Sequence, residues 1–168
     1  MSVHIQDSPA LAYRRAGEAH DLDALMATLA DDVVFHSPLS AGAEFRGKEQ
    51  ARELFSVVLD VLSDMRYLTD VGDERTRALT ATARLGRMEL HEAAVLEMGE
   101  DGLIKELTIW IRPLPALTTM MAALGPGLAR ATGRPALALL VGAAVKPLAA
   151  MTRFGDRTLV PLVARRRR

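Results

Sequence analysis

The chain has 168 residues, of which 49% are hydrophobic, and it contains no cysteine. This length can bury a substantial core, the apolar content excludes a largely disordered chain, and the lack of cysteine excludes disulfides, thiolate metal sites and a cysteine nucleophile. The 21 acidic and 21 basic residues are unevenly placed, because residues 1–112 hold 20 acids and 12 bases whereas residues 113–168 hold one acid and nine bases. This change from −8 to +8 predicts a domain over residues 1–112 and an apolar, basic extension over residues 113–168.

Three helices are predicted at the start of the chain. Ser8 and Pro9 favour a helix start, because serine caps free amides and proline suits the first helical position. This helix extends to about His20, and Asp21 caps a second one over residues 22–30. A short strand over residues 33–37 and a loop over residues 40–47 follow. The third helix has the clearest apolar stripe, formed by Ala51, Leu54, Phe55, Val58, Leu59 and Leu62.

Four strands are predicted after these helices, over residues 65–71, 76–85, 87–98 and 103–112. Gly86 and the run Gly99-Glu100-Asp101-Gly102 supply the turns between the last three. Helices followed by consecutive antiparallel strands predict an α+β fold. We expect a cone-shaped α+β barrel, with the three N-terminal helices packed on a curved, mainly antiparallel sheet.

The strands alternate between apolar and polar residues, which assigns their faces. On the strand over residues 87–98 the apolar face consists of Met88, Leu90, Ala94, Leu96 and Met98, and it also carries Glu92. On the last strand Leu107, Ile109 and Ile111 share the predicted inner face. His91 lies on the face opposite Glu92, and a β-bulge would exchange the two.

Several short segments carry a family pattern. They are His20-Asp21-Leu22-Asp23-Ala24-Leu25, the segment from Ala30 to Pro38, Phe45-Arg46-Gly47, and the hairpin that ends in Trp110. With the order of elements, they make residues 8–112 resemble the nuclear transport factor 2-like superfamily, and within it the SnoaL-like polyketide cyclase and ketosteroid isomerase branches. The resemblance implies a cone that encloses an apolar small molecule. It does not imply one reaction, because this fold hosts several chemistries and also proteins without catalysis.

The resemblance implies catalytic positions that this chain fills only in part. Isomerases of the family use a tyrosine donor on the first helix, an aspartate base before the proline of the first strand, and an acidic donor on a middle strand. In this chain these positions fall on Tyr13, on Ser37 and near Ala94. Because serine without a partner base cannot move a carbon-bound proton near neutral pH, the ketosteroid isomerase mechanism is not predicted.

Tyr13, Glu92 and His91 are the candidate catalytic residues. Tyr13 is either a hydrogen-bond donor to a ligand carbonyl or a core tyrosine with a structural partner. Glu92 on an apolar face is a candidate base, unless a register shift exposes it or Arg84 pairs with it. His91 is the alternative base. The candidate ligand-binding residues are Phe35, Ser37, Phe55, Leu59, Met88, Leu90, Ala94, Leu107, Ile109 and Ile111.

Two functions remain open at this stage. The first is a cofactor-independent cyclase, isomerase or hydrolase that acts by acid–base chemistry on a polyketide-, terpenoid- or steroid-like carbonyl compound. The second is a noncatalytic carrier or sensor of a lipid-like ligand. No metal site is predicted, because the four histidines are scattered and none has a second ligand at short spacing. A glycine-rich phosphate loop is also lacking, and we expect no cofactor.

The extension is predicted to hold a helix over residues 114–131, broken at Gly125-Pro126-Gly127, and an apolar run over residues 136–145 that Lys146-Pro147 ends. Two kinds of contact remain open for this extension, and a third is not expected. Packing as a lid or an arm of a homodimer would cover its apolar surface. Contact with an anionic membrane surface would use its arginines. Nucleic-acid binding is not expected, because the acidic domain opposes phosphates.

The first seven residues include His4 and Asp7 and no apolar signal segment. We therefore expect a cytoplasmic protein, which would lie at the inner face of a membrane if the extension binds lipid. An outward-facing Trp110 is a candidate contact of the expected homodimer.

Overall fold

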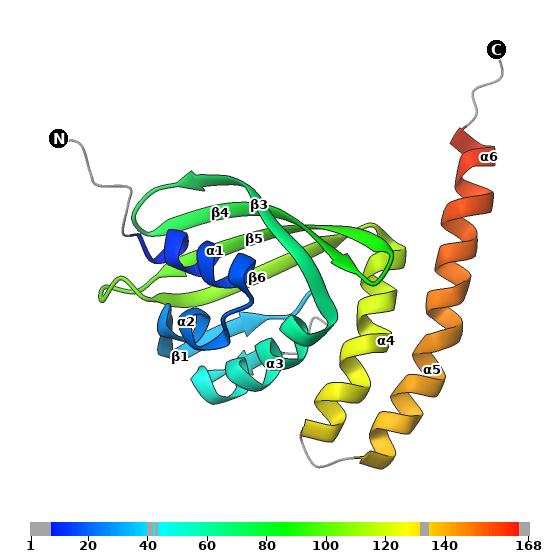
Figure 1. Ribbon diagram of the computed structural model, residues 1–168, viewed down its shortest axis with the longest axis horizontal. Coiled ribbons are helices and arrows are strands. Elements are labelled where there is room, and N and C mark those ends of the chain that lie inside the picture. The colour runs from blue at the N-terminus through cyan, green and yellow to red at the C-terminus, as the bar shows by residue number, and fades with distance from the viewer. Residues whose placement is uncertain (1–7, 40–41, 43, 132–134, 165–168) are drawn as a thin grey trace. The chain divides into compact units, whose positions relative to one another are not determined.

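The computed structural model describes residues 8–39, 42, 44–131 and 135–164. The chain forms two compact units, Met1–Ile111 and Arg112–Arg168, which Figure 1 shows together with the elements of each. In the described residues the first unit combines helices with a sheet, and the second is helical.

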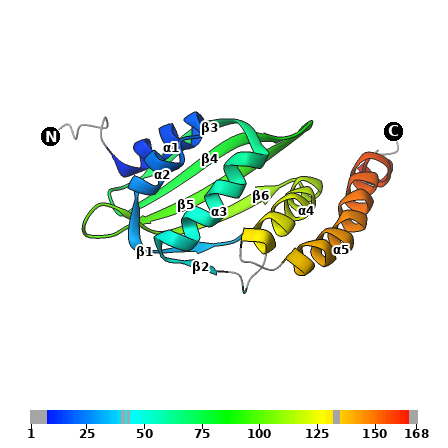
Figure 2. The same cartoon turned by 60° about the horizontal axis from the view of Figure 1, so that its bottom comes forward.

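Three helices pack on one face of the sheet in the first unit, as Figures 1 and 2 show. They are α1 (Pro9–Ala19), α2 (Leu22–Ala27) and α3 (Gly47–Val61). The Ser8 and Asp21 side chains accept hydrogen bonds from free amides at the starts of α1 and α2, so both predicted caps are confirmed. Ala51, Leu54 and Phe55 form the buried side of α3, as its apolar stripe predicts.

A curved six-stranded sheet forms the rest of this unit. Its strands are β1 (Leu29–His36), β2 (Glu44–Arg46), β3 (Leu62–Gly72), β4 (Thr76–Leu85), β5 (Met88–Met98) and β6 (Ile104–Arg112). Their order is β2-β1-β6-β5-β4-β3, with β1 parallel to β6 and antiparallel to β2. The predicted α+β cone fold is confirmed. The prediction that the sheet closes into a barrel is wrong, because β2 and β3 are the two edges of an open sheet.

The region around β1 differs from the sequence-based expectation in two ways. The second helix ends at Ala27 rather than at residue 30, because the Thr28 carbonyl accepts a hydrogen bond from Ile104 N–H and Leu29 pairs with Ile104. Residues 44–46, predicted as part of a loop, pair with the end of β1 as the short edge strand β2. In both places long-range pairing decides the backbone, and local residue spacing cannot reveal it.

The core lies between the helices and the inner face of the sheet. Leu90, Ala94 and Leu96 on β5 are at most 1% exposed, and Leu107 on β6 is fully buried. Trp110, on the other face of β6, is 54% exposed. The predicted alternation of faces on both strands is therefore confirmed.

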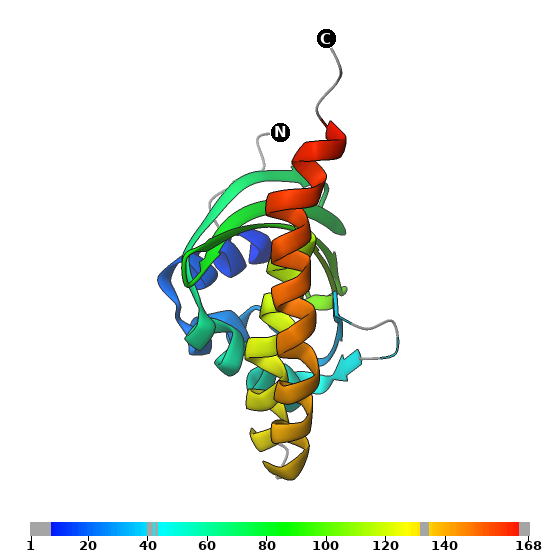
Figure 3. The same ribbon diagram turned by 90° about the vertical axis from the view of Figure 1, so that its right-hand side faces the viewer.

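The second unit contains two long helices that run antiparallel as a hairpin (Figures 1 and 3). Its elements are α4 (Leu114–Ala131), α5 (Pro135–Phe154), the π-helical turn η2 (Gly155–Leu159) and α6 (Val160–Ala164). The predicted breaks at residues 125–127 and at Lys146-Pro147 are wrong, because Pro126 and Pro147 lie inside continuous helices. Gly142 of α5 lies beside Pro126 of α4, since a Cβ on Gly142 would be 3.5 Å from the proline ring.

Candidate functional site

Three residues lie in one row across neighbouring strands of the first unit. Tyr67 on β3 pairs with Ala81 on β4, and Ala81 pairs with Glu92 on β5. Directly paired residues point their side chains to the same face of a sheet. Ala81 contributes only a methyl group, so the longer side chains of Tyr67 and Glu92 can extend over it from backbones about 10 Å apart.

Tyr13 meets this row from α1. It is 2% exposed, and its ring lies edge-on to the ring of Tyr67 with 6.2 Å between the centroids. Burial raises the pKa of Tyr13 first, and the nearby charge of Glu92 raises it further. Burial is also the main reason why the pKa of Tyr67 is well above its usual value, with the Tyr13 and Glu92 charges adding to it. Both phenols are therefore neutral and available as hydrogen-bond donors at physiological pH.

The two phenol groups also interact with each other. A hydrogen bond between their side chains is a further, smaller influence on the pKa of each, after burial. The Tyr13 hydroxyl thus lies close to Tyr67 and within the influence of the Glu92 charge.

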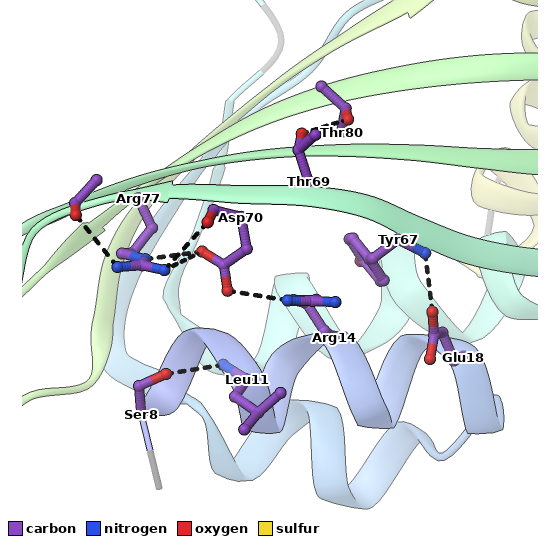
Figure 4. Close-up of polar contacts among 10 residues, drawn as sticks. Ser8, Leu11, Arg14, Glu18, Tyr67, Thr69, Asp70, Arg77 and Thr80 are labelled. Atoms are coloured by element: carbon purple, nitrogen blue, oxygen red, sulfur yellow. Dashed lines mark hydrogen bonds and ion pairs between the residues drawn. The ribbon is translucent and has the colours of Figure 1, made fainter. Parts of the chain in front are cut away.

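One side of α1 is built to receive Tyr67. A Cβ at Gly17 would lie 3.2 Å from the Tyr67 hydroxyl oxygen, so any larger residue there would have to push the phenol slightly away. Cζ of Arg14 lies 5.9 Å from the centre of the Tyr67 ring, which is within the range of a cation–π contact. The backbone N–H of Tyr67 donates to Oε1 of Glu18 at 2.8 Å. Contacts from three residues of α1 thus hold Tyr67 in place, and Figure 4 shows the hydrogen bond to Glu18 among them.

A network of charged side chains fixes α1 to the sheet beside these tyrosines (Figure 4). Oδ2 of Asp70 on β3 lies 3.1 Å from Nη1 of Arg14, and Oδ1 accepts a hydrogen bond from Nε of Arg77 at 2.8 Å and another from its Nη2. The Asp70 side chain is 11% exposed, and both arginine side chains are about a quarter exposed. A carboxylate held by two guanidinium groups is a strong, directional contact. It makes the position of α1, and hence of Tyr13, rigid.

Glu92 is a buried acid without a compensating charge. It is 7% exposed, and burial raises its pKa from 4.5 to about 7. In the part of the chain that the structure describes, no salt bridge or side-chain hydrogen bond involves Glu92. Arg84, which could have paired with it, is exposed and lies 4.0 Å from Asp64 instead. Because its pKa is close to 7, Glu92 can both take up and release a proton at neutral pH.

The other predicted site residues occupy several places. Leu90, Ala94, Leu107 and Ile109 are buried on the inner face of the sheet, whereas Leu59, Met88 and Ile111 are partly exposed. Phe35 of β1 and Phe55 of α3 are buried and lie edge-to-face, with 5.8 Å between their centroids. These two rings form core contacts with each other. Their predicted role toward a ligand stays a prediction.

His91 and Ser37 lie apart from the Tyr13, Tyr67 and Glu92 group. The His91 side chain is 40% exposed, and its Nε2 lies 3.4 Å from Oε1 of Glu89 on the outer face of the sheet. The hydroxyl of Ser37 accepts a hydrogen bond from Leu39 N–H at 3.2 Å, which closes a turn at the end of β1. Of the two alternative bases, the structure places Glu92 with Tyr13 and places His91 on the opposite face.

Tyr67 is the site residue that the sequence did not reveal. It stands in an edge strand that was expected from β-propensity alone, and no spacing rule connects it to Tyr13, 54 positions earlier. One signal was available, because the chain contains only two tyrosines and a second phenol near the first is a natural partner for it. The register of β3 on β4 determines that the Tyr67 side chain points toward Tyr13, and this register depends on the bulges that β3 contains.

The described residues contain no group of three or more histidine, aspartate or glutamate side chains that could hold a metal ion. No helix in the described ranges is both long enough and apolar enough to cross a membrane.

The family and fold of the chain follow from comparison with known proteins. Residues 10–107 match the model of the SnoaL-like domain. No protein among the curated proteins matches the chain.

Several solved structures are similar. A steroid Δ-isomerase from Pseudomonas aeruginosa is 25% identical, with a TM-score of 0.63 over 79% of this chain and 96% of that one. An uncharacterised protein with a cystatin-like fold from Silicibacter pomeroyi is 20% identical, with a TM-score of 0.67 over 82% of this chain and 94% of that one. A SnoaL-like protein of unknown function from Burkholderia thailandensis is 20% identical, with a TM-score of 0.54 over 62% and 91%.

Proposed function

Since the chain belongs to the SnoaL-like domain family, we propose that it is a cofactor-independent enzyme that moves a proton next to a carbonyl group of an apolar small molecule. The observation that carries this proposal is Glu92, a buried acid with no ionic partner and a pKa of about 7. Its charge acts on the buried phenols of Tyr13 and Tyr67. A base beside neutral hydrogen-bond donors is the arrangement that enolisation needs.

The proposed reaction consists of two proton transfers. The carboxylate of Glu92 removes a proton from the carbon next to the substrate carbonyl, and the carbonyl oxygen gains the negative charge of an enolate. Tyr13 O–H donates a hydrogen bond to that oxygen, while the ring of Tyr67 packs edge-on against the ring of Tyr13 and holds it in position. Glu92 then returns the proton to a carbon of the substrate, so that no cofactor or second reactant is consumed. Return to a different carbon isomerises the substrate. In the alternative outcome the enolate carbon attacks a second carbonyl and closes a ring, and Glu92 then gives its proton to the alkoxide oxygen formed there.

The apolar surroundings of Glu92 support an apolar substrate. Leu90 and Ala94 flank it on the same face of β5, and Leu107 and Ile109 lie on the inner face of β6. A polyketide, terpenoid or steroid-like ring fits such a surface. The similarity to a steroid Δ-isomerase structure, at 25% identity, supports the same class of substrate.

Hydrogen exchange tests this proposal without knowledge of the natural substrate. A β,γ-unsaturated ring ketone is incubated with the protein in deuterium oxide, and deuterium at the carbon between the carbonyl and the double bond is measured by mass spectrometry. Glu92→Gln is expected to lower the exchange rate by a factor of about 10² to 10⁴, and Tyr13→Phe by about 10². For the wild type, the rate is expected to rise with pH and to reach half its maximum near pH 7, because only the carboxylate form of Glu92 is a base.

Further variants distinguish the role of Glu92 from that of other residues. Glu97→Gln makes the same chemical change on an exposed position of β5, and exchange is expected to continue at the wild-type rate. Loss of exchange in His91→Gln together with retention in Glu92→Gln would make His91 the base and refute the assignment. If a ketone binds the wild type but its hydrogen is not exchanged for deuterium, the proposed enzymatic activity is refuted. The protein would then be a carrier. The predicted homodimer and cytoplasmic location stay predictions.

A further inference from the structure

The outer side of the second unit carries a long apolar stripe. Its members lie on α5, η2 and α6 and are between 39% and 87% exposed, namely Leu140, Leu148, Met151, Phe154, Leu159, Val160, Leu162 and Val163. They extend over 24 positions of one continuous helical rod, or about 35 Å (Figure 3). Single exposed leucines are normal, whereas a continuous row of this length marks a contact surface.

A π-helical turn interrupts the rod within this stripe. In an α-helix a residue five positions after Phe154 would be rotated by about 140° around the axis. In η2 the N–H of Val160 bonds to the carbonyl of Gly155, five residues earlier, so the turn is wider than an α-helical turn and residues five apart are rotated by less. Leu159 therefore lies nearer to the line of Met151 and Phe154 than it would in an α-helix.

The side of α5 opposite the stripe packs on α4. Ala149 is 2% exposed, and Thr152 Oγ1 lies 2.7 Å from Thr118 Oγ1 of α4. Arg153 Nη1 donates to Thr119 Oγ1 of α4 at 3.4 Å. Helical spacing places Leu140, Met151 and Phe154 on the far side from these residues. The stripe is thus not part of the core between the two helices of the unit.

The charges beside the stripe are almost all positive. Lys146, Arg153 and Arg157 lie together at one border of the stripe by helical position, and Asp156 is the single acid of α5, η2 and α6. The sequence continues with Arg165 to Arg168, so residues 135–168 contain seven basic groups and one acidic group. A helix with an apolar side of Leu, Val, Met and Phe and a basic border is the kind that lies in the plane of an anionic bilayer surface.

We propose that α5, η2 and α6 form a binding surface for anionic lipid bilayers, with the apolar stripe inserted between the headgroups and the arginines on lipid phosphates. The basic border and the apolar side chains beside it complement the negative headgroups and the acyl chains of such a bilayer. This surface is separate from the Glu92 site, so the proposal does not depend on the proposed reaction.

Vesicle flotation of the full chain tests the proposal. The wild type is expected to float with vesicles of about three parts phosphatidylcholine to one part phosphatidylglycerol, and not with phosphatidylcholine alone. Binding is expected to fall when the salt concentration rises from about 0.05 M to about 0.5 M, because salt screens the arginines. Met151→Ser combined with Leu162→Ser should weaken binding at least about tenfold, since both side chains lose their apolar insertion.

A matched control is available in the first unit. Leu68 and Val71 of β3 are 62% and 61% exposed, close to the 62% of Leu162 and 65% of Met151. Leu68→Ser combined with Val71→Ser is expected to leave vesicle binding unchanged. Circular dichroism checks that both double variants keep their helices. If they weaken binding equally, the stripe has no special role and the proposal is overturned.

Measurement of the mass in solution separates lipid from a second copy of the chain. If the wild type does not bind anionic vesicles and the stripe variant has a lower mass, the stripe docks on another copy and the proposal is overturned. Absence of both effects overturns it as well. Glu92→Gln should bind vesicles as the wild type does, so a failure of the proposed reaction would not be mistaken for a failure of lipid binding.

Discussion

Replacement of Glu92 by glutamine is expected to remove a specific pH dependence of stability. The side chain of glutamine has nearly the same shape as a protonated glutamate but cannot ionise. Glu92 has a pKa of about 7 in the folded protein against an ordinary value of 4.5. The folded protein therefore holds a proton that the unfolded chain releases between these two values.

The sign and size of the effect follow from this difference. Where the folded state binds more protons than the unfolded state, the free energy of unfolding falls as the pH rises. The stabilising contribution of the protonated Glu92 is complete below about pH 4.5 and is lost as the pH rises through about 7. At about 1.4 kcal/mol per pH unit, the total loss is about 3 kcal/mol. The glutamine variant should not suffer this loss.

Urea unfolding at several pH values measures the effect. The difference in free energy of unfolding between Glu92→Gln and the wild type should be small near pH 4 and should favour the variant by about 3 kcal/mol near pH 8. Other titrating groups cancel in this difference because both proteins contain them. Glu97→Gln, on the exposed side of the same strand, should follow the wild type at every pH. A constant difference for Glu92→Gln across this range would refute the reasoning.

Three further predictions concern the surroundings of the site. Tyr67→Phe keeps the ring but removes the hydroxyl beside Tyr13, so deuterium exchange should slow about tenfold, while urea unfolding should change by less than about 1.5 kcal/mol. An unchanged exchange rate would exclude a role for this hydroxyl. Asp70→Asn removes the charge that holds Arg14 and Arg77, so the free energy of unfolding should fall by about 1 to 3 kcal/mol. A change near zero would contradict a structural role for this network. Leu90→Ala, at a fully buried position, should cost about 2 to 5 kcal/mol, and a smaller loss in the same assay would show that the core can close around the cavity.

The helices and hairpin strands of the first unit could be predicted because their signals are local. The apolar stripe of α3 and the alternation on β5 each reflect one buried side of one element. The caps at Ser8 and Asp21 depend on atoms within three residues. Family resemblance added the arrangement of these elements, which periodicity alone does not specify.

The missed features depend on contacts between distant residues. The early start of β1 follows from its pairing with Ile104, more than 70 positions later. The helices of the second unit continue through Pro126 and Pro147, although each proline removes a hydrogen bond, because packing between two helices outweighs one lost bond. Tyr67 joins the site through strand register and through Gly17, and neither has a sequence signal of its own.

The contrast between Asp70 and Glu92 favours a functional explanation for Glu92. Both are acids on neighbouring parts of the sheet and both are largely buried. Asp70 shows how this fold satisfies such a group, because two arginines bind its oxygens. Glu92 lies deeper among apolar residues, and in the described chain it has no such partner. A purely structural acid would gain stability from a partner or from replacement by an apolar residue. An acid that lowers stability by about 3 kcal/mol at neutral pH, next to two neutral phenols, is what a general base requires, since a stabilised carboxylate would be too weak to remove a proton from carbon.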